Sequence, residues 1–264
     1  MTSEFITEMI RFAEVLADEA RAVLTAAMSK TPDVELKSDK SYVTETDKAI
    51  ETRLREIIDE RYPQHGILGE EHGSRDLDAE YVWVLDPIDG TAPFVAGIPV
   101  FGTLIGLARG GRPWLGVIDH PASDDRWVGV SGEMAMCNGE PVRTRPCRDI
   151  ASALMTNSNP DFFGDEDRAR FDALRAQVTY TQYGGSCYAY GVMASGRTDL
   201  SADGGLDPFD IFAPAAVIEG AGGVVTDWSG GAIDLDWRGL VLAAGDEALH
   251  ETALGVLAGG SAAR

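Results

Sequence analysis

The stretch 83-WVLDPIDGTAPF-94 places an apolar run directly before two aspartates, Asp86 and Asp89, which a glycine and a threonine follow. A short, continuous apolar run bounded by turn residues is typical of a strand that is covered on both faces. Pro87 cannot donate to a sheet ladder, so the pattern predicts that this strand ends at Asp86. Both carboxylates then lie at the carboxyl end of a buried strand, where open α/β sheets hold their ligands. Because crowded carboxylates repel each other, a metal ion between them is the simplest way to stabilise them.

The charge balance of the chain argues against two classes of partner. Among 264 residues, 43 Asp and Glu stand against 22 Lys and Arg, which gives a formal net charge of -21. Nucleic-acid binding and anionic-membrane binding both need a basic surface, so we expect neither partner. Most of the acids are expected to form a solvated surface, and a few of them to be ligands.

The sequence shows no sign of export. Its start, MTSEFITEMIRF, has acids where a signal peptide has a basic end and an apolar run, and no segment approaches the roughly 18 uninterrupted apolar residues of a membrane span. The three cysteines, Cys137, Cys147 and Cys187, form neither a metal-binding spacing nor an even disulfide set. We therefore expect a cytoplasmic protein whose cysteines are packing residues.

The periodicity of apolar residues changes near residue 150. Before it, helical spacing predicts helices at 3–29 and about 46–61, and short apolar runs between turn signals predict largely antiparallel strands from 82 to 145. After it, strands and helices alternate, which is typical of an α/β fold. The elements expected there are strands at 153–157, 178–183, 199–202, 224–227 and 240–244 and helices at 165–177, 187–194, 209–221 and 247–257. We expect an α+β half, 1–150, and an α/β half, 151–264, packed as alternating helix and sheet layers.

Three further acidic signals resemble the opening stretch. Glu70 follows the short apolar run of 66-GILGEEHG-73, while Asp47 and Asp210 each lie in the first turn of an expected helix. Taken singly, an acid at a helix start is more often a cap than a ligand. Taken together, Glu70, Asp86, Asp89 and Asp210 offer only hard oxygen ligands. Such a set suits Mg²⁺ or Mn²⁺ and not zinc, which prefers His or Cys.

These residues also form the motifs of a known family. The chain resembles the inositol monophosphatase superfamily of magnesium-dependent, lithium-sensitive phosphatases, and the resemblance runs from about Lys37 to Leu242. The motifs that carry it are 69-GEE-71, 85-LDPIDGT-91, Asp210 with 219-EGAGG-223, and 43-VTETD-47 in support. The segments most similar to the histidinol-phosphate phosphatase branch are 99-PVFGTLIGL-107, 116-GVIDHP-121, 126-RWVG-129 and 184-GGSCYAYG-191. The resemblance implies an α-β-α-β-α sandwich, a homodimer and a small phosphorylated metabolite as substrate.

The resemblance also implies a set of metal ligands. Glu70, Asp86 and the backbone carbonyl of Ile88 would hold one Mg²⁺, and Asp86, Asp89 and Asp210 would hold a second. A third, loosely held ion near Glu70 would have Lys37 beside it, so two or three Mg²⁺ are expected, with Mn²⁺ as a possible replacement. Paired ions of this kind clamp both ends of an in-line displacement.

Further roles follow from the same resemblance. Gly90 and Thr91 would offer backbone N–H groups to the phosphate. The Thr91 hydroxyl, oriented by Asp47, would position the attacking water together with Glu70. The leaving alcohol would be surrounded by Gly185, Ser186, Asp203, Asp207 and Asp210.

The identity of that alcohol is the open part of the prediction. Carboxylates at Asp203 and Asp207 favour the cationic end of histidinol phosphate over a neutral polyol. Ser186 stands where the histidinol-phosphate branch has Asp, and Ala92 and Pro93 depart from the family pattern after 89-DGT-91. Inositol 1-phosphate is the runner-up, followed by another sugar or nucleotide phosphate.

Rival functions have weaker support. Ser186 lacks the G-x-S-x-G elbow of a serine hydrolase, and the four histidines are scattered along the chain. A non-catalytic protein that binds a phosphate ester or a divalent cation would keep the acids. Such a protein would not need Thr91 and Asp47 to orient a water molecule.

Overall fold

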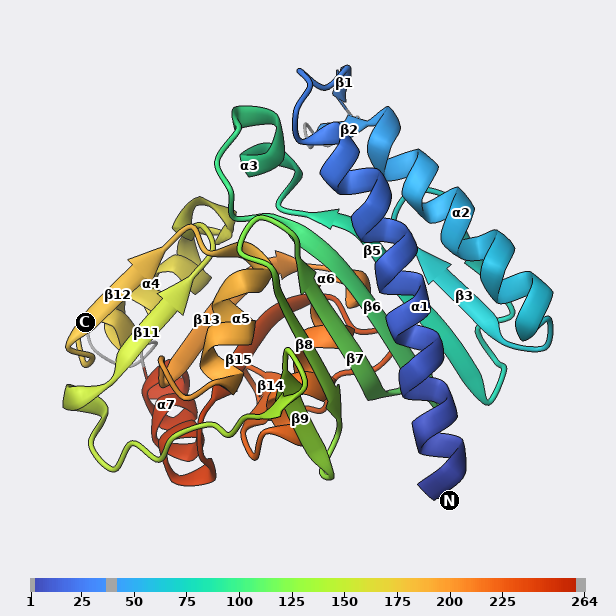
Figure 1. Ribbon diagram of the computed structural model, residues 1–264. Helices are drawn as coiled ribbons and strands as arrows, with labels where there is room; N and C mark the ends of the chain where they lie inside the picture. Colours follow the sequence, from blue (N-terminus) through green and yellow to red (C-terminus); the bar gives the residue numbers. More distant parts are fainter. Residues whose placement is uncertain (1–2, 37–41, 260–264) are drawn as a thin grey trace.

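The computed structural model describes residues 3–36 and 42–259 (Figure 1). Its helices are α1 (Ser3–Ala27), α2 (Glu45–Arg61), α3 (Thr91–Ala96), α4 (Asp165–Arg175), α5 (Ser186–Ala194), α6 (Pro208–Gly220) and α7 (Glu247–Gly259). Helices α1 and α2 cover one face of an eight-stranded sheet, α5 and α6 lie between it and a five-stranded sheet, and α4 and α7 cover the far side. The predicted α-β-α-β-α sandwich is confirmed. None of the described helices is long and apolar enough to cross a membrane.

The two large sheets differ in strand direction. The eight-stranded sheet has the order β10-β9-β8-β7-β6-β5-β3-β4 and is antiparallel except where β3 pairs with β5. The five-stranded sheet has the order β12-β11-β13-β15-β14, with β11 parallel to both its neighbours. Strand bounds are β1 (Val34–Leu36), β2 (Tyr42–Thr44), β3 (Gly66–Gly69), β4 (Gly73–Arg75), β5 (Tyr81–Asp89), β6 (Gly102–Arg109), β7 (Arg112–His120), β8 (Asp125–Val130), β9 (Met134–Cys137), β10 (Glu140–Pro141), β11 (Leu154–Asn157), β12 (Tyr180–Tyr183), β13 (Leu200–Leu206), β14 (Val224–Asp227) and β15 (Gly239–Ala244). The predicted antiparallel run before residue 145 is therefore present.

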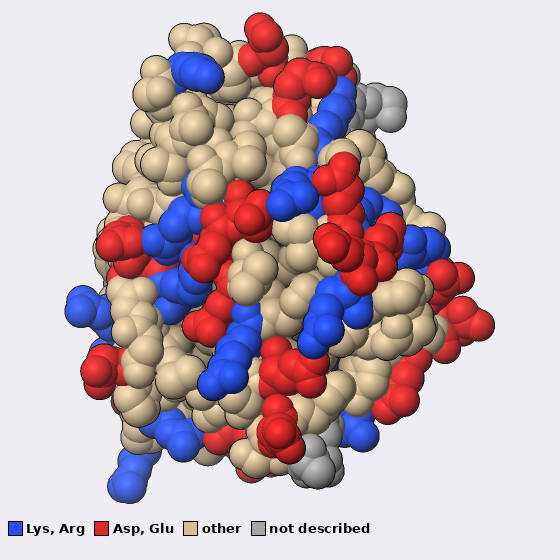
Figure 2. Space-filling model, turned by 45° about the vertical axis from the view of Figure 1, so that its right-hand side comes forward, with Lys and Arg blue, Asp and Glu red and all other residues tan. Residues whose placement is uncertain are grey.

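Helices α1 and α2 form for the reasons that their sequences indicate. The buried residues of α1 recur at helical spacing, from Met9 to Leu24. Thr44 caps α2, where it forms a capping box with Asp47. Exposed ion pairs such as Arg53–Glu19 at 2.9 Å join the two helices, and Figure 2 shows basic side chains interspersed with acidic ones on one face of the molecule. Such exposed pairs contribute little to stability.

Helix α6 is the buried centre of the molecule. Its residues are apolar nearly all round, and it packs against β6, β7 and β8 of the larger sheet and β14 of the smaller one. Glycines on the sheet permit this approach, because a Cβ on Gly116 would lie 2.2 Å from the Ala213 carbonyl oxygen and one on Gly129 would lie 2.4 Å from Val217 Cα. The two parts of the chain therefore share a core across α6, and the division at residue 150 stays a prediction.

The prediction that the strand with the two aspartates ends at Asp86, which was based on Pro87, is wrong. Strand β5 continues to Asp89. Asp86 lies opposite Leu104 and Asp89 opposite Gly102, so β5 has one more residue than β6 across this interval. Proline is tolerated at such a β-bulge because the ladder is already interrupted there. The bulge brings the carboxylates of Asp86 and Asp89 to the same side.

Candidate metal centre

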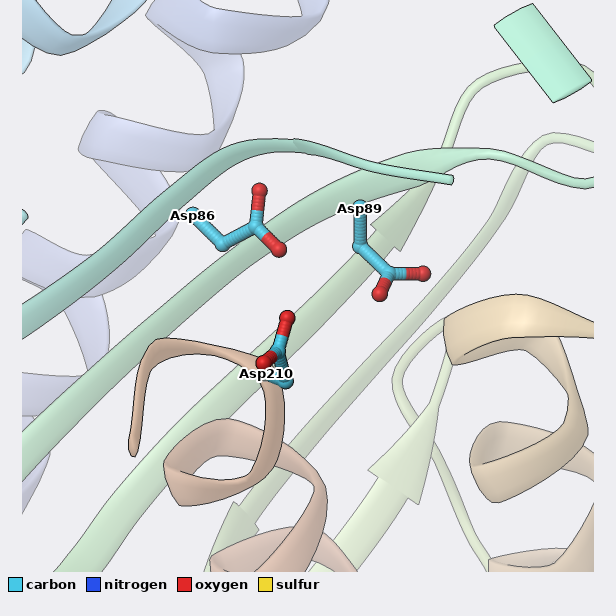
Figure 3. Close-up of side chains that lie close together, drawn as sticks. All are labelled: Asp86, Asp89 and Asp210. Carbon is cyan, nitrogen blue, oxygen red and sulfur yellow. The ribbon is translucent and has the colours of Figure 1, made fainter. Parts of the chain in front are cut away.

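Three aspartates converge where β5 passes the start of α6 (Figure 3). Asp86 and Asp89 come from the bulged end of β5, and Asp210 comes from the first turn of α6. One carboxylate oxygen from each lies within 4.8 Å of the others. The sequence predicted all three residues as ligands of a shared site, and the structure brings them together although more than 120 residues separate Asp86 from Asp210.

Backbone donors hold two of these carboxylates in place. Asp89 Oδ2 accepts a hydrogen bond from the Cys187 N–H at the start of α5, at 2.6 Å. Asp210 Oδ2 accepts one from the Asp207 N–H at 2.6 Å, as the second half of a capping box. Each acid is thus oriented by a helix start and keeps an oxygen for another partner.

Asp86 has the fewest hydrogen-bond partners of the three aspartates. Its residue is 1% exposed, and its Oδ1 has no hydrogen-bond partner among the described residues. A buried carboxylate oxygen without a partner costs free energy, so such atoms occur where a ligand completes the site. In the described part of the chain no Lys or Arg forms an ion pair with any of the three aspartates.

Burial and mutual repulsion shift the acidity of the cluster. Burial, followed by the negative charges of Glu70, Asp89 and Asp210, raises the pKa of Asp86 well above its usual range. Burial likewise raises the pKa of Asp210 well above its usual range. It raises the pKa of Asp89 to about 6, against the lowering effect of the Cys187 hydrogen bond. Burial is the largest cause of all three shifts, and the neighbouring carboxylates add to it at Asp86 and Asp210.

Glu70 lies at the edge of this cluster. It follows β3, and its N–H donates to the Leu85 carbonyl on β5 at 3.2 Å. Its charge contributes to the raised pKa of both Asp86 and Asp210, although its carboxylate is not one of the three that lie within 4.8 Å of one another. The Ile88 carbonyl, predicted as a further ligand, accepts a hydrogen bond from the Thr91 hydroxyl at 3.0 Å. Lys37 lies outside the described residues.

Asp47 is buried beside the cluster but is held by neutral donors. Its Oδ2 accepts from the Thr44 N–H at 2.9 Å and from the Thr44 hydroxyl at 2.5 Å, while its Oδ1 has no partner in the described chain. Burial raises its pKa. Because Thr91 donates to Ile88 in this structure, the predicted orientation of its hydroxyl by Asp47 stays a prediction.

Gly90 and Ser186 lie against each other at the rim of the site. Gly90 has a left-handed φ of 81°, and a Cβ there would lie 2.9 Å from Ser186 Oγ. Ser186 itself has φ 45°, an unusual value for a residue with a side chain. The turn of Gly185 and Ser186 is therefore placed directly over the segment that was predicted to bind phosphate.

The two other acids predicted near the substrate already have partners. Asp203 is 2% exposed and accepts hydrogen bonds from four donors, which are Asn157 Nδ2, the Ser158 N–H, the Tyr190 hydroxyl and the Ser201 hydroxyl. Asp207 forms an ion pair with Arg238. A substrate ammonium group would have to compete with these donors for either carboxylate.

One buried acid near the site was not singled out from the sequence. Glu51 is fully buried on α2, and its carboxylate binds the turn that follows Glu70. A signal was present, because Asp47 and Glu51 are four residues apart on the face of α2 that also carries Ile50, Leu54 and Ile58. A charged residue among core positions usually has a specific partner.

Comparison with known proteins adds independent information. Residues 6–259 match the inositol monophosphatase family. A chloroplastic bifunctional phosphatase of Arabidopsis thaliana is 42% identical over 262 residues, which cover 94% of this chain and 75% of that protein. A histidinol-phosphatase of Chlorobaculum parvum is 30% identical over 240 residues, which cover 90% of this chain and 93% of that protein. The solved structure of an inositol monophosphatase from Zymomonas mobilis has a TM-score of 0.87 and 36% identity, and the match covers 98% of this chain and 100% of that chain.

Proposed function

The chain belongs to the inositol monophosphatase family, whose members are magnesium-dependent phosphatases, and we propose that it hydrolyses histidinol phosphate, with inositol 1-phosphate as the second candidate substrate. The structural observation that best supports a metal-dependent phosphatase is the convergence of Asp86, Asp89 and Asp210. A phosphate dianion would be repelled by this cluster unless cations reversed the local charge. A protein that merely binds a phosphate ester would need the same cations, so the argument against it is that binding alone would not need Thr91 and Asp47 to orient a water molecule.

The donor set fits hard divalent cations. Carboxylate and carbonyl oxygens are the ligands that Mg²⁺ prefers, and the unpartnered Asp86 Oδ1 leaves room for one. We assign Glu70, Asp86 and the Ile88 carbonyl to one ion, and Asp86, Asp89 and Asp210 to a second. When bound, these ions would lower the pKa of a water molecule and offset the charge that develops on the leaving oxygen.

The protein's own groups then orient the reactants. The Gly90 and Thr91 backbone would hold the phosphate, and the Thr91 hydroxyl would turn from the Ile88 carbonyl towards the attacking water. Asp47 would orient the Thr91 hydroxyl and accept, through that hydroxyl, the one proton that the water loses, while Glu70 would help to hold the water in position. Burial raises the pKa of Asp47, which is the direction that favours a proton acceptor.

The hydrogen bonds of Asp203 and the ion pair of Asp207 weaken the electrostatic reason for a cationic alcohol, so the choice of substrate rests on the comparisons. A histidinol-phosphatase that is 30% identical matches over 90% of this chain, which supports histidinol phosphate. The solved inositol monophosphatase matches more completely, over 98% of this chain at 36% identity, which keeps inositol 1-phosphate as the alternative. Ser186 is the residue best placed to distinguish them, because its hydroxyl lies beside Gly90.

The test is kcat/KM for both substrates at equal Mg²⁺, on the wild type and on Ser186→Asp. Histidinol phosphate should be preferred by the wild type. A carboxylate at position 186 would attract its ammonium group and should widen the preference by roughly tenfold, about 1.4 kcal/mol. A preference for inositol 1-phosphate that Ser186→Asp leaves unchanged would refute the substrate assignment and leave the phosphatase assignment intact.

We further propose a homodimer and inhibition by Li⁺. Both are expected from the family and are tested by a light-scattering mass and a lithium titration of turnover. A cytoplasmic location stays a prediction, since the Arabidopsis relative is chloroplastic.

A further inference from the structure

The carboxylate of Glu51 lies beneath the turn that carries Glu70. Its Oε2 accepts the Glu71 N–H at 2.7 Å, and its Oε1 accepts the His72 N–H at 3.1 Å. The residue is 0% exposed, so these bonds are made without competition from water. One side chain of α2 therefore binds two successive backbone groups of the turn between β3 and β4.

Gly69 is fitted to the same carboxylate. A Cβ at Gly69 would lie 2.0 Å from Glu51 Oε1 and 2.4 Å from Glu51 Cδ. The φ of Gly69 is not in the left-handed region, so the close approach of Glu51, rather than the backbone conformation, explains the glycine. Any other residue at position 69 would displace the carboxylate from the turn.

The backbone of Glu70 is consequently fixed from both sides. On one side its own N–H donates to the Leu85 carbonyl, one residue before Asp86. On the other side the next two N–H groups donate to Glu51. We propose that Glu51 is a positioning residue that sets the affinity of the metal centre by fixing the Glu70 carboxylate opposite Asp86 and Asp210. The inference rests on the proposed metal-dependent function.

The charge of Glu51 is balanced without the metal centre. Arg55 Nε donates to Glu51 Oε1 at 2.7 Å, and Arg55 also donates to the Gly73 carbonyl. His72 Nε2 lies 3.0 Å from the Thr52 hydroxyl, which gives the turn a second attachment to α2. Loss of the Glu51 charge should thus loosen the turn near Glu70 and leave the turn attached to the helix.

The test is direct binding of Mn²⁺ to the metal-stripped protein, measured by calorimetry and by electron paramagnetic resonance. Glu51→Gln keeps the size of the side chain but removes one acceptor oxygen and the charge. It should weaken Mn²⁺ binding about tenfold, as is typical for residues that orient a metal ligand. Saturating metal should restore most of the kcat, because the ligands themselves are unchanged.

Glu219→Gln is the matched control. Glu219 lies at the opposite end of α6 from Asp210 and pairs with the Ser131 hydroxyl, and burial raises its pKa. The Glu219→Gln change should alter the melting temperature. It should leave the Mn²⁺ affinity within about twofold of the wild type, because Glu219 is distant from the metal centre. Equal Mn²⁺ affinity for wild type, Glu51→Gln and Glu219→Gln would refute the positioning role.

Gly69→Ala displaces the carboxylate while Glu51 itself is retained. Gly69→Ala should also weaken Mn²⁺ binding. If Glu51→Gln does not fold, Gly69→Ala tests the positioning role of Glu51 in its place. Unchanged affinity in Gly69→Ala would then overturn the inference. A wild-type protein that binds no Mn²⁺ would instead refute the proposed metal centre, and with it this role for Glu51.

Discussion

Two buried aspartates of the eight-stranded sheet have opposite surroundings. Asp119, at the end of β7, has a fully buried side chain and is paired with Arg21 of α1 at 2.9 Å and Arg126 of β8 at 2.5 Å. Asp86, on β5, is equally buried but faces Glu70, Asp89 and Asp210. The first aspartate has cations supplied by the protein and fastens α1 to the sheet. The second lacks them in the described chain, and we interpret this deficit as the mark of a binding site for external cations.

The largest effect is expected where the protein supplies the counter-ions. Asp119→Asn would leave Arg21 and Arg126 without their shared carboxylate. Because Arg21 keeps Asp124 and Arg126 keeps Asp18, we expect a loss of about 3 kcal/mol, the lower end of the range for a buried pair that loses one partner. Urea denaturation monitored by circular dichroism measures this loss. A destabilisation below about 1 kcal/mol would place Asp119 among ordinary surface pairs and remove the contrast with Asp86.

The same kind of substitution in the unpaired cluster, Asp89→Asn, should affect catalysis instead of folding. Asp89→Asn removes one negative ligand of the proposed second metal and should reduce Mg²⁺-dependent turnover by more than about 100-fold, while the fold stays intact. Steady-state kinetics at saturating Mg²⁺ provide the measurement, with circular dichroism as the control for folding. Retention of more than a tenth of wild-type activity would show that Asp89 is not a metal ligand.

The lack of cations beside Asp86, Asp89 and Asp210 should also affect how the stability of the metal-free protein depends on pH. The pKa of Asp89 is raised to about 6, and those of Asp86 and Asp210 are raised well above the usual range. The folded protein therefore binds protons that the unfolded chain releases, so the cluster should lower the unfolding free energy as pH rises from about 4 through 6, by up to about 3 kcal/mol for the shift of Asp89 alone. Added Mg²⁺ should stabilise the protein more at pH 7.5 than at pH 5.5, because protons compete with the metal.

A control is needed because buried histidines act in the opposite direction. Burial lowers the pKa of His65, His120 and His250, which removes stability as pH falls. The difference in melting temperature between wild type and Asp89→Asn, in the presence of a chelator, cancels their effect. A difference that does not grow between pH 5 and pH 7 would contradict the proposed repulsion.

The smallest effect is expected at Asp47, which has neutral donors instead of cations. Thr44→Ala removes the hydroxyl that donates to Asp47 and caps α2, and the cost of losing such a cap is about 1 kcal/mol. Thermal unfolding without metal measures this cost. A loss as large as that of Asp119→Asn would mean that the neutral pair stabilises the fold as strongly as the ionic one.

Much of this arrangement could be predicted from the sequence, because local patterns determined it. The apolar spacing of α1 and α2 identified the two helices, and the acids after apolar runs identified three aspartates that the structure brings together. The extension of β5 past Pro87 could not be predicted, because a bulge depends on the pairing with β6. Nor could the roles of Glu51 and Asp203, whose partners come from segments about 20 and 45 residues distant in the chain.

The most direct test of a metal-dependent phosphatase centre at Asp86, Asp89 and Asp210 is chelation followed by replacement of the metal. Phosphate release from histidinol phosphate and inositol 1-phosphate would be followed in purified protein before EDTA treatment, after it, and after the addition of excess Mg²⁺. We expect hydrolysis to stop in EDTA and to return with Mg²⁺ in the wild type, with no return in Asp89→Asn. Hydrolysis that continues unchanged in EDTA would contradict the proposed role of the three aspartates.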